Sequence, residues 1–343
     1  MPVFPESAPY LAPRASVGGL MREVLLALVP GIALLTWQFG PGVLIQCLIA
    51  LAAAEAAEAA VLALRGRRVV PALGDCSAAL TAVLLAVSLP PLVPWWITAL
   101  GTLFAIVIGK QIYGGLGYNP FNPAMAGYAM LLISFPRPMT AWLPPVDWAA
   151  APLGVAAAWT AISGGESPDG RGHDGLAMAT PLSMIRTQVS LAQGRDEIRT
   201  ALDFAGTGAG GWHWVNFGFL VGGLWLLRRK RIAWQIPAGL LGALFAASLG
   251  FFLIDPAVHP TPLFQLFSGA TMLGAFFIAT DPVSAATTPR GRLMYGAGIG
   301  LLVFVIRTWG GYPDGFAFAI LLLNLAAPTI DRYTRPQVYG HPR

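Results

Sequence analysis

One apolar segment of the chain ends in Gly109-Lys110-Gln111-Ile112-Tyr113-Gly114-Gly115 and continues through Gly117-Tyr118-Asn119-Pro120. A second apolar segment ends in Ile306-Arg307-Thr308-Trp309-Gly310-Gly311-Tyr312-Pro313. Each contains a cation, an aromatic residue, paired glycines, a tyrosine and a proline before the next apolar segment begins. The match predicts an internal repeat. The alternative is that unrelated helix ends use glycine and proline alike.

The composition is that of a protein with many membrane spans. The chain has 56% hydrophobic and 11% charged residues, whereas a soluble chain carries about 25% charged residues. Its 40 glycines and 29 prolines suit membrane helices that pack through small residues and whose neighbours satisfy interrupted backbone. The net charge of +5 comes from basic residues that cluster at helix ends, which is a topology signal. No nucleic-acid partner is expected.

Ten apolar segments are long enough to be read as bilayer spans. Five spans separate the equivalent segments of the repeat, and an odd number inverts the second copy. We therefore expect an all-α membrane protein built as a 5+5 inverted repeat. Residues 1–136 and 213–343 form the two copies, and residues 137–212 form one long loop. Inverted repeats place ligand sites at the interface between the copies, where helices are broken. The expected span cores are 22–39, 43–64, 77–93, 95–112, 121–136, 213–228, 233–254, 263–280, 293–308 and 314–331.

Lysine and arginine set the expected orientation. With a cytoplasmic N-terminus, 15 of the 21 basic residues lie on the cytoplasmic side, and the short outer loops hold only Arg307. The other five lie in the long loop, which the positive-inside rule discounts. The pattern predicts a multi-pass protein with cytoplasmic N- and C-termini, and with the loop 137–212 outside the cytoplasm.

The long loop contains the run Asp174-Gly175-Leu176-Ala177-Met178-Ala179-Thr180-Pro181-Leu182. Threonine at the N-cap, proline at the first helical position and Gly194 near the end together predict a short helix. The Thr180 hydroxyl would then lie at the positive end of a helix dipole, among unpaired N–H groups that form an anion site. On this pattern alone, an ordinary helix cap is the better interpretation.

Several polar residues fall in or beside the expected spans. Glu55 and Glu58 lie three apart in the second span, on one helical face. A charge at the bilayer centre costs about 3 kcal/mol, so the pair is either part of a proton or sodium path or is satisfied structurally by nearby arginines. Asp281, at the inner end of the eighth span, has the same two interpretations, of which capping a proline-containing turn is favoured. Asn119 and Asn122 begin a broken helix on the cytoplasmic side, where their amides could bind a ring or cap the backbone.

Four stretches carry a resemblance to a known family. Over nearly its whole length the chain resembles the NqrB/RnfD family of membrane redox subunits, and within it the RnfD branch of the Rnf electron-transport complex. The most specific stretch is Phe-Ser-Gly-Ala-Thr-Met-Leu-Gly-Ala-Phe-Phe-Ile-Ala-Thr-Asp-Pro-Val-Ser, residues 267–284. The others are Gly117-Tyr118-Asn119-Pro120-Phe121-Asn122-Pro123, Asp174 to Leu182, and Gly310 to Gly315.

The resemblance implies a covalent FMN, joined through its phosphate to a loop threonine by a dedicated flavin transferase. The family motif is Asp-Gly, a few residues, then Ala-Thr. It falls here on Asp174, Gly175, Ala179 and Thr180. Met178 stands where the NqrB-like version has glycine, as in the RnfD variant. The resemblance therefore reverses the interpretation of Thr180, from a helix cap to the site of covalent FMN.

A similar tetrapeptide, Ser268-Gly269-Ala270-Thr271, matches the flavinylation motif of the partner subunit RnfG. It lacks a preceding Asp-Gly, and it begins the expected eighth span, where a transferase could not easily reach it. We assign it to close helix packing or cofactor lining. The resemblance also implies a second, non-covalent riboflavin, for which Asn119 and Asn122 are candidates.

The function that the resemblance implies is electron relay in an ion-translocating ferredoxin:NAD oxidoreductase complex of the bacterial inner membrane, coupled to Na⁺ or H⁺ transport. The expected partners are RnfA, RnfB, RnfC, RnfE and RnfG. The chain would be a non-autonomous subunit without catalytic acid or base residues. It has no Rossmann fingerprint and no P-loop, so NADH and ferredoxin should bind other subunits. His173, His213 and His259 show no metal-ligand spacing, so no metal is expected.

Two other functions stay open. One is an NqrB-like subunit of a sodium-pumping NADH:quinone reductase. Against it stand the Met-Ala-Thr variant and the lack of a long N-terminal extension. The other is a transporter that resembles urea channels, because a ten-span inverted repeat would also suit a channel without a cofactor. A transporter would purify colourless, whereas a flavoprotein subunit would be yellow.

Overall fold

The computed structural model describes residues 16–149, 153–165, 177–190, 211–312 and 314–335. Within these ranges every regular element is a helix, and an isolated β-bridge pairs Trp142 with Met178. The sequence-based expectation of an all-α chain holds for the residues that the structure describes.

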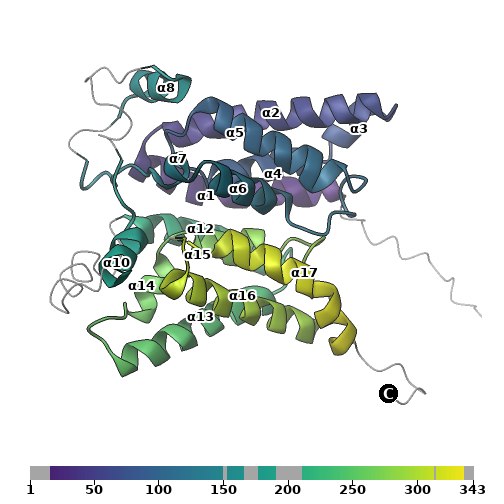
Figure 1. Ribbon diagram of the computed structural model, residues 1–343. Coiled ribbons are helices and arrows are strands. Elements are labelled where there is room, and N and C mark those ends of the chain that lie inside the picture. Colours follow the sequence, from purple (N-terminus) through teal and green to yellow (C-terminus); the bar gives the residue numbers. More distant parts are fainter. Residues whose placement is uncertain (1–15, 150–152, 166–176, 191–210, 313, 336–343) are drawn as a thin grey trace, which may run out of the picture.

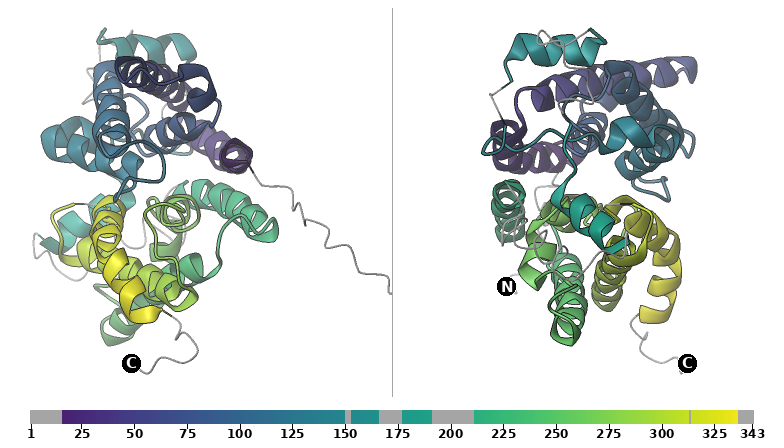
Figure 2. Two further views of the ribbon diagram at one scale, coloured as in Figure 1. Left: turned by 90° about the vertical axis from the view of Figure 1, so that its right-hand side faces the viewer. Right: turned by 60° about the vertical axis from the view of Figure 1, so that its left-hand side comes forward.

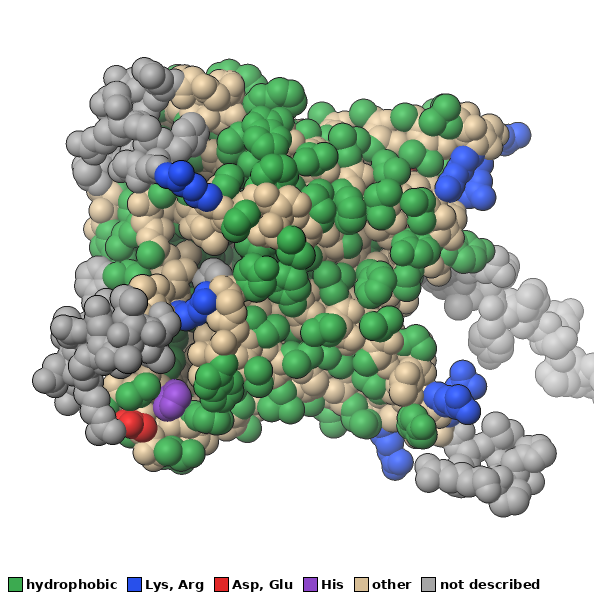
Figure 3. All heavy atoms as spheres, in the orientation of Figure 1, with side chains coloured by type: hydrophobic (Ala, Val, Ile, Leu, Met, Phe, Trp, Pro, Cys, Tyr) green, Lys and Arg blue, Asp and Glu red, His purple; other side chains and the backbone are tan. Residues whose placement is uncertain are grey.

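Five helices are long and apolar enough to cross a membrane by length and composition. Figure 3 shows hydrophobic side chains covering the middle of the visible face, while charged side chains gather towards its two ends. The chain is therefore a multi-pass membrane protein. The long helices are α1 (Val17–Phe39), α2 (Gly42–Leu64), α13 (Gln235–Ile254), α16 (Pro289–Trp309) and α17 (Phe316–Thr334).

Shorter helices complete the two halves of the molecule. α5 continues directly into a π-helical segment, η1, and α15 continues into a second π-helical segment, η2. In the first half these helices are α3 (Val69–Leu73), α4 (Ser77–Ala86), α5 (Trp95–Leu103), η1 (Phe104–Gln111) and α6 (Pro123–Ser134). In the second half they are α12 (Trp212–Arg228), α14 (Pro262–Phe267), α15 (Thr271–Leu273) and η2 (Gly274–Ile278).

Two of the expected spans are not continuous helices. The third was expected over 77–93, but α4 ends at Ala86 because Pro90, Pro91 and Pro94 remove backbone donors and cannot continue a helix. The eighth, expected over 263–280, is broken between α14 and α15 at residues 268–270. There Gly269 takes a left-handed φ of 55°, which an L-residue with a side chain rarely adopts. Both breaks lie where the two halves face each other.

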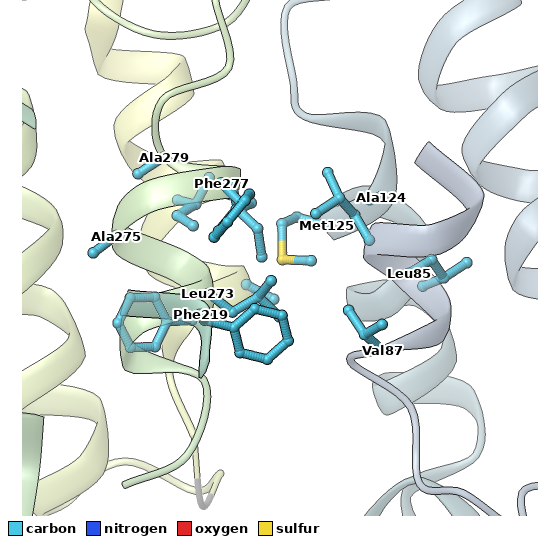
Figure 4. Close-up of a cluster of buried hydrophobic side chains, with 14 of the residues drawn as sticks. Leu85, Val87, Ala124, Met125, Phe219, Leu273, Ala275, Phe277 and Ala279 are labelled. Atoms are coloured by element: carbon cyan, nitrogen blue, oxygen red, sulfur yellow. The ribbon is translucent and has the colours of Figure 1, made fainter. Parts of the chain in front are cut away.

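The two halves pack side by side (Figures 1 and 2). α1 runs along α12, and α6 contacts α17. The α1–α12 contact is close because Gly222 has no side chain: a Cβ atom there would overlap the carbonyl oxygen of Ala27. Small residues let membrane helices approach in this way. Figure 4 shows Met125 of the first half reaching towards Leu273 and Phe277 of the second.

The segment that connects the two halves in the sequence has its helices towards the left of the molecule in Figure 1. It contains α7 (Pro136–Thr140), α8 (Val155–Ser163) and α10 (Pro181–Ser190). α8 packs against α2, and α10 contacts α16 of the second half. The expected loop 137–212 therefore contains helices that dock on both halves.

Candidate functional site

A cavity lies between the two halves, and the start of α10 forms part of its lining. Its empty volume is about 1000 Å³, including the open space at its mouth. Apolar side chains from both halves form its walls, among them Leu35 and Met125 from the first half and Phe219 and Leu273 from the second. Thr180 to Ser183 form part of its rim. Mostly apolar walls with a few polar groups are typical of small-molecule and cofactor sites.

Thr180 is half-buried at this rim and caps α10. Its Oγ1 accepts a hydrogen bond from the Ser183 backbone N–H at 3.2 Å and lies 2.8 Å from Ser183 Oγ. Pro181 is the first helical residue, where its missing N–H costs nothing. The predicted N-cap is confirmed. α10 reaches Ser190 in the described part of the chain, and Gly194 lies outside the described residues.

The segment before Thr180 is attached to the body of the protein. The Met178 backbone N–H donates to the Trp142 carbonyl at 2.7 Å. Trp142 in turn packs against Phe39 and Trp212, with ring centroids 5.5 and 4.9 Å apart. On the other side of Thr180, Leu182 and Ile185 of α10 are buried in the core. These anchors hold the Thr180 hydroxyl at the cavity.

The other members of the expected attachment motif are only partly described. Ala179 is exposed beside Thr180. Asp174 and Gly175 lie outside the described residues, so the expected turn before the threonine stays a prediction.

The helix break at residues 268–270 contributes polar groups to the cavity. Ser268 is almost fully buried and lines the cavity, and its Oγ has no hydrogen-bond partner in the described structure. Asp314 also lines the cavity, and its Oδ2 accepts the Ala270 backbone N–H at 2.9 Å. An unpartnered buried hydroxyl is costly, so Ser268 is suited to a ligand in the cavity.

Arg307 stabilises the break at residues 268–270 through hydrogen bonds and an ion pair. It pairs with Asp314 at 3.2 Å and donates to the Ser268 carbonyl at 3.2 Å. It also donates to the Thr271 hydroxyl at 3.1 Å. Asp314 falls within the stretch Gly310 to Gly315, where the sequence alone gives it no role. Sequence reasoning missed it because its function depends on a break in a distant helix.

Thr271, the threonine of the second tetrapeptide, is fully buried. Its hydroxyl lies 3.0 and 2.8 Å from the carbonyl oxygens of Gln265 and Ser268. With the bond from Arg307, these contacts use the hydroxyl to stabilise the helix break. Residues 268–270 line the cavity, while Thr271 holds their backbone from inside.

A second cavity, with an empty volume of about 760 Å³, also lies between the halves. It brings together Asn119, Asn122, Lys110 and Asp281. Asn122 caps α6, because its Oδ1 accepts the Met125 N–H at 3.2 Å. Asn119 donates through Nδ2 to a neighbouring carbonyl, but its buried Oδ1 has no partner among the described residues.

Asp281 lies at the edge of the second cavity and caps its own turn. Its carboxylate accepts the Val283 N–H at 3.2 Å and the Ser284 hydroxyl at 2.8 Å. Burial raises the pKa of the Asp281 carboxyl, and the hydrogen bonds from Ser284 and Val283 oppose that shift. The capping interpretation agrees with this geometry.

Glu58 is buried against Lys110, at 2.6 Å. Gln111 donates to the same oxygen, Glu58 Oε1, at 2.7 Å, while Oε2 is buried without a partner in the described structure. Lys110 also donates to Ser77 Oγ at 2.6 Å. The cation that pairs with Glu58 is thus Lys110 of η1, whereas an arginine was expected.

Glu55 does not join this pair. It is exposed on the outer side of α2, whereas Ala54, Ala57 and Glu58 are buried. The two glutamates, expected on one helical face, thus differ in burial. A spacing of three residues turns them about 60° apart around the axis, which here crosses the boundary between the packed and the uncovered side.

The chain matches one protein family and several relatives over nearly its whole length. The family described as NQR2, RnfD, RnfE matches residues 5–340. A protein from Aeromonas hydrophila subsp. hydrophila, named as the D subunit of an ion-translocating oxidoreductase complex, is 56% identical over 344 residues, which covers 98% of each chain. Proteins of the same name from Yersinia pseudotuberculosis and Shewanella amazonensis are 53% and 52% identical, covering 98% of this chain and 97% of theirs.

Proposed function

The chain belongs to the NQR2, RnfD, RnfE family, and on that premise we propose that it is the membrane flavoprotein subunit of an ion-translocating ferredoxin:NAD oxidoreductase complex. Relatives named as the D subunit of ion-translocating oxidoreductase complexes match it over nearly its whole length. The proposed role is electron relay through an FMN whose phosphate is esterified to Thr180. When bound, FMN supplies the redox chemistry, and the protein supplies position and electrostatics.

The observation that carries this proposal is the position of the Thr180 hydroxyl, at the N-terminus of α10 and on the rim of the cavity between the halves. A phosphate on this oxygen would lie among the first N–H groups of the helix, where the dipole favours negative charge. The apolar walls of the cavity would hold a flat ring system, and Ser268 offers it a hydroxyl that has no partner among the described residues. The residues present therefore fit the group.

The second cavity is our proposed site for a non-covalent riboflavin. Asn119 has a buried Oδ1 without a partner among the described residues, and it lines the cavity together with Phe276 and Phe277. An amide oxygen accepts hydrogen bonds, which suits a ligand with N–H or hydroxyl groups. Asn122 lines the same cavity, although its Oδ1 is already used in capping α6. In this proposal Asn119 contacts the ligand, and Asn122 shapes the wall.

The 5+5 inverted repeat and the orientation belong to the same proposal. The two motif cations are both buried beside a carboxylate, Lys110 with Glu58 and Arg307 with Asp314. This parallel supports the repeat. The protein would span the inner membrane, with its termini in the cytoplasm and α10 on the opposite side of the membrane. RnfA, RnfB, RnfC, RnfE and RnfG would be the partners, and a flavin transferase would attach the FMN at the outer face.

Glu58 is the residue that we propose for the path of Na⁺ or H⁺. Its Oε2 is buried without a partner in the described structure, and Lys110 neutralises the charge of the group. A buried carboxylate inside a bundle is a common element of ion and proton paths. Glu55 is left out of this path because it faces away from the interior.

Flavin fluorescence in a denaturing gel tests the attachment site. Thr180→Val is expected to abolish fluorescence of the band, because the variant has no hydroxyl to form the ester. Thr271→Val is expected to keep it. The opposite pair of results would move the site to the second tetrapeptide. A colourless wild-type protein from cells that contain the transferase would favour a transporter.

A further inference from the structure

Glu55 lies near the middle of a membrane-spanning helix. α2 runs from Gly42 to Leu64, so at 1.5 Å per residue Glu55 is about 20 Å from the first end and about 14 Å from the second. The hydrocarbon core of a bilayer is about 30 Å thick. A glutamate side chain is too short to reach either interface, unlike the long side chains of lysine and arginine.

Nothing within this chain satisfies the Glu55 carboxylate among the residues that the structure describes. It is exposed on the surface of α2 and takes part in no ion pair or hydrogen bond there. The nearest arginine along the helix, Arg65, lies ten residues away and donates to Gln111. A lone carboxylate facing lipid at this depth costs about 3 kcal/mol, so a cation from beyond the described residues would stabilise it.

The face around Glu55 is shaped for another helix. Its exposed neighbours on α2 are small: Ala52, Ala56, Ala60 and Ala63. Small residues allow helix backbones to approach closely in a membrane, so that interhelical polar contacts can form. Among the residues that the structure describes, no other element covers this face. α8 packs on α2 only towards its outer end, around Ile45 and Ile49.

We propose that residues 52–63 of α2 are the docking surface for a membrane-spanning helix of another subunit of the complex, with a lysine or arginine side chain placed against Glu55. The names of the relatives describe a subunit of a larger assembly, so other membrane subunits are expected. A basic partner follows from charge complementarity at a site that becomes buried on assembly. A second copy of this chain, docked through the same face, would bring two Glu55 carboxylates together and repel.

Co-purification of the whole complex in mild detergent tests the proposal. Glu55→Lys is expected to weaken retention of one membrane subunit about a hundredfold, since it places like charges in a buried contact. Ala56→Leu should lose the same subunit, because the added bulk prevents close approach. The matched control is Ala246→Leu, the same change at an exposed alanine of α13, and it should retain every subunit.

Full retention of all subunits by Glu55→Lys and Ala56→Leu would overturn the proposal. If Glu55→Lys does not reach the membrane, a photo-crosslinking amino acid at position 56 of the otherwise unchanged chain decides the matter. An adduct with a different membrane subunit is the expected result, and adducts only with lipid or with a second copy would contradict it. In-gel flavin fluorescence of the same samples separates this test from the proposed function, because docking at α2 does not depend on Thr180.

Discussion

The hydroxyl of Thr180 lies 2.8 Å from the hydroxyl of Ser183, at the point where α10 begins and the cavity between the halves opens. Two hydroxyls and the positive end of the helix dipole therefore meet at one helix end. Both hydroxyls have the chemistry to form a phosphoester, but of the two only Thr180 has the Ala-Thr context. The contact makes Ser183 the sharpest local control for the attachment site.

Ser183→Ala is expected to keep the covalent flavin. The substitution removes the hydroxyl contact but leaves the Ser183 backbone N–H that Thr180 caps. Alanine is also a good helix former. In-gel fluorescence should match the wild type, while Thr180→Val shows none. Loss of fluorescence in Ser183→Ala, with the protein still folded in the membrane, would mean that the phosphate needs or occupies Ser183.

Thr271→Val is expected to destabilise the fold without removing the flavin. Its hydroxyl accepts a bond from Arg307 and faces the carbonyls of Gln265 and Ser268. Valine removes the hydrogen bonds of the hydroxyl, each worth about 0.5–1.5 kcal/mol, although Arg307 still donates to both carbonyls. The midpoint of thermal unfolding in detergent should fall. An unchanged midpoint would show that Thr271 does not hold the break at residues 268–270.

Lys110→Met is expected to cost more than replacing both members of the ion pair. Removing the lysine alone leaves the buried Glu58 carboxylate uncompensated, at about 3–5 kcal/mol. The double variant Lys110→Met with Glu58→Leu removes both charges and should recover part of the loss. Thermal unfolding of the four proteins forms a double-mutant cycle. Strictly additive effects would contradict direct coupling across the 2.6 Å contact.

Gly222→Val is expected to push the two halves apart. A side chain there overlaps the Ala27 carbonyl oxygen on α1, and backbone atoms cannot yield as a flexible side chain can. The matched control is Gly242→Val on α13, where a Cβ meets open space. Folded yield in membranes should drop for Gly222→Val alone. Equal yields would show that α1 and α12 can separate without loss.

The long helices could be predicted from the sequence because hydropathy alone defines them. α1 and α2 begin and end within a few residues of the expected spans. The cap at Thr180 was also predictable, since Thr-Pro before an apolar pattern is a local signal. Both rest on interactions between residues that are close in the chain.

The parts that could not be predicted depend on residues far apart in the chain. Ser268 gains its importance because the helix breaks there and the residue lines the cavity together with Met125 and Phe219. Asp314 contributes through its ion pair with Arg307 and the hydrogen bond that it accepts from the Ala270 N–H. Helical spacing cannot say which side of α2 is covered, so Glu55 was grouped with Glu58 although packing separates them.

Mass spectrometry of peptides that contain Thr180 tests the central claim most directly. The protein should be expressed with its flavin transferase, digested, and fragmented to locate the modified residue. The account predicts one FMN adduct, linked through phosphate to Thr180, and unmodified peptides that contain Thr271. An adduct on any other residue, or unmodified Thr180 in protein from cells with an active transferase, would contradict it.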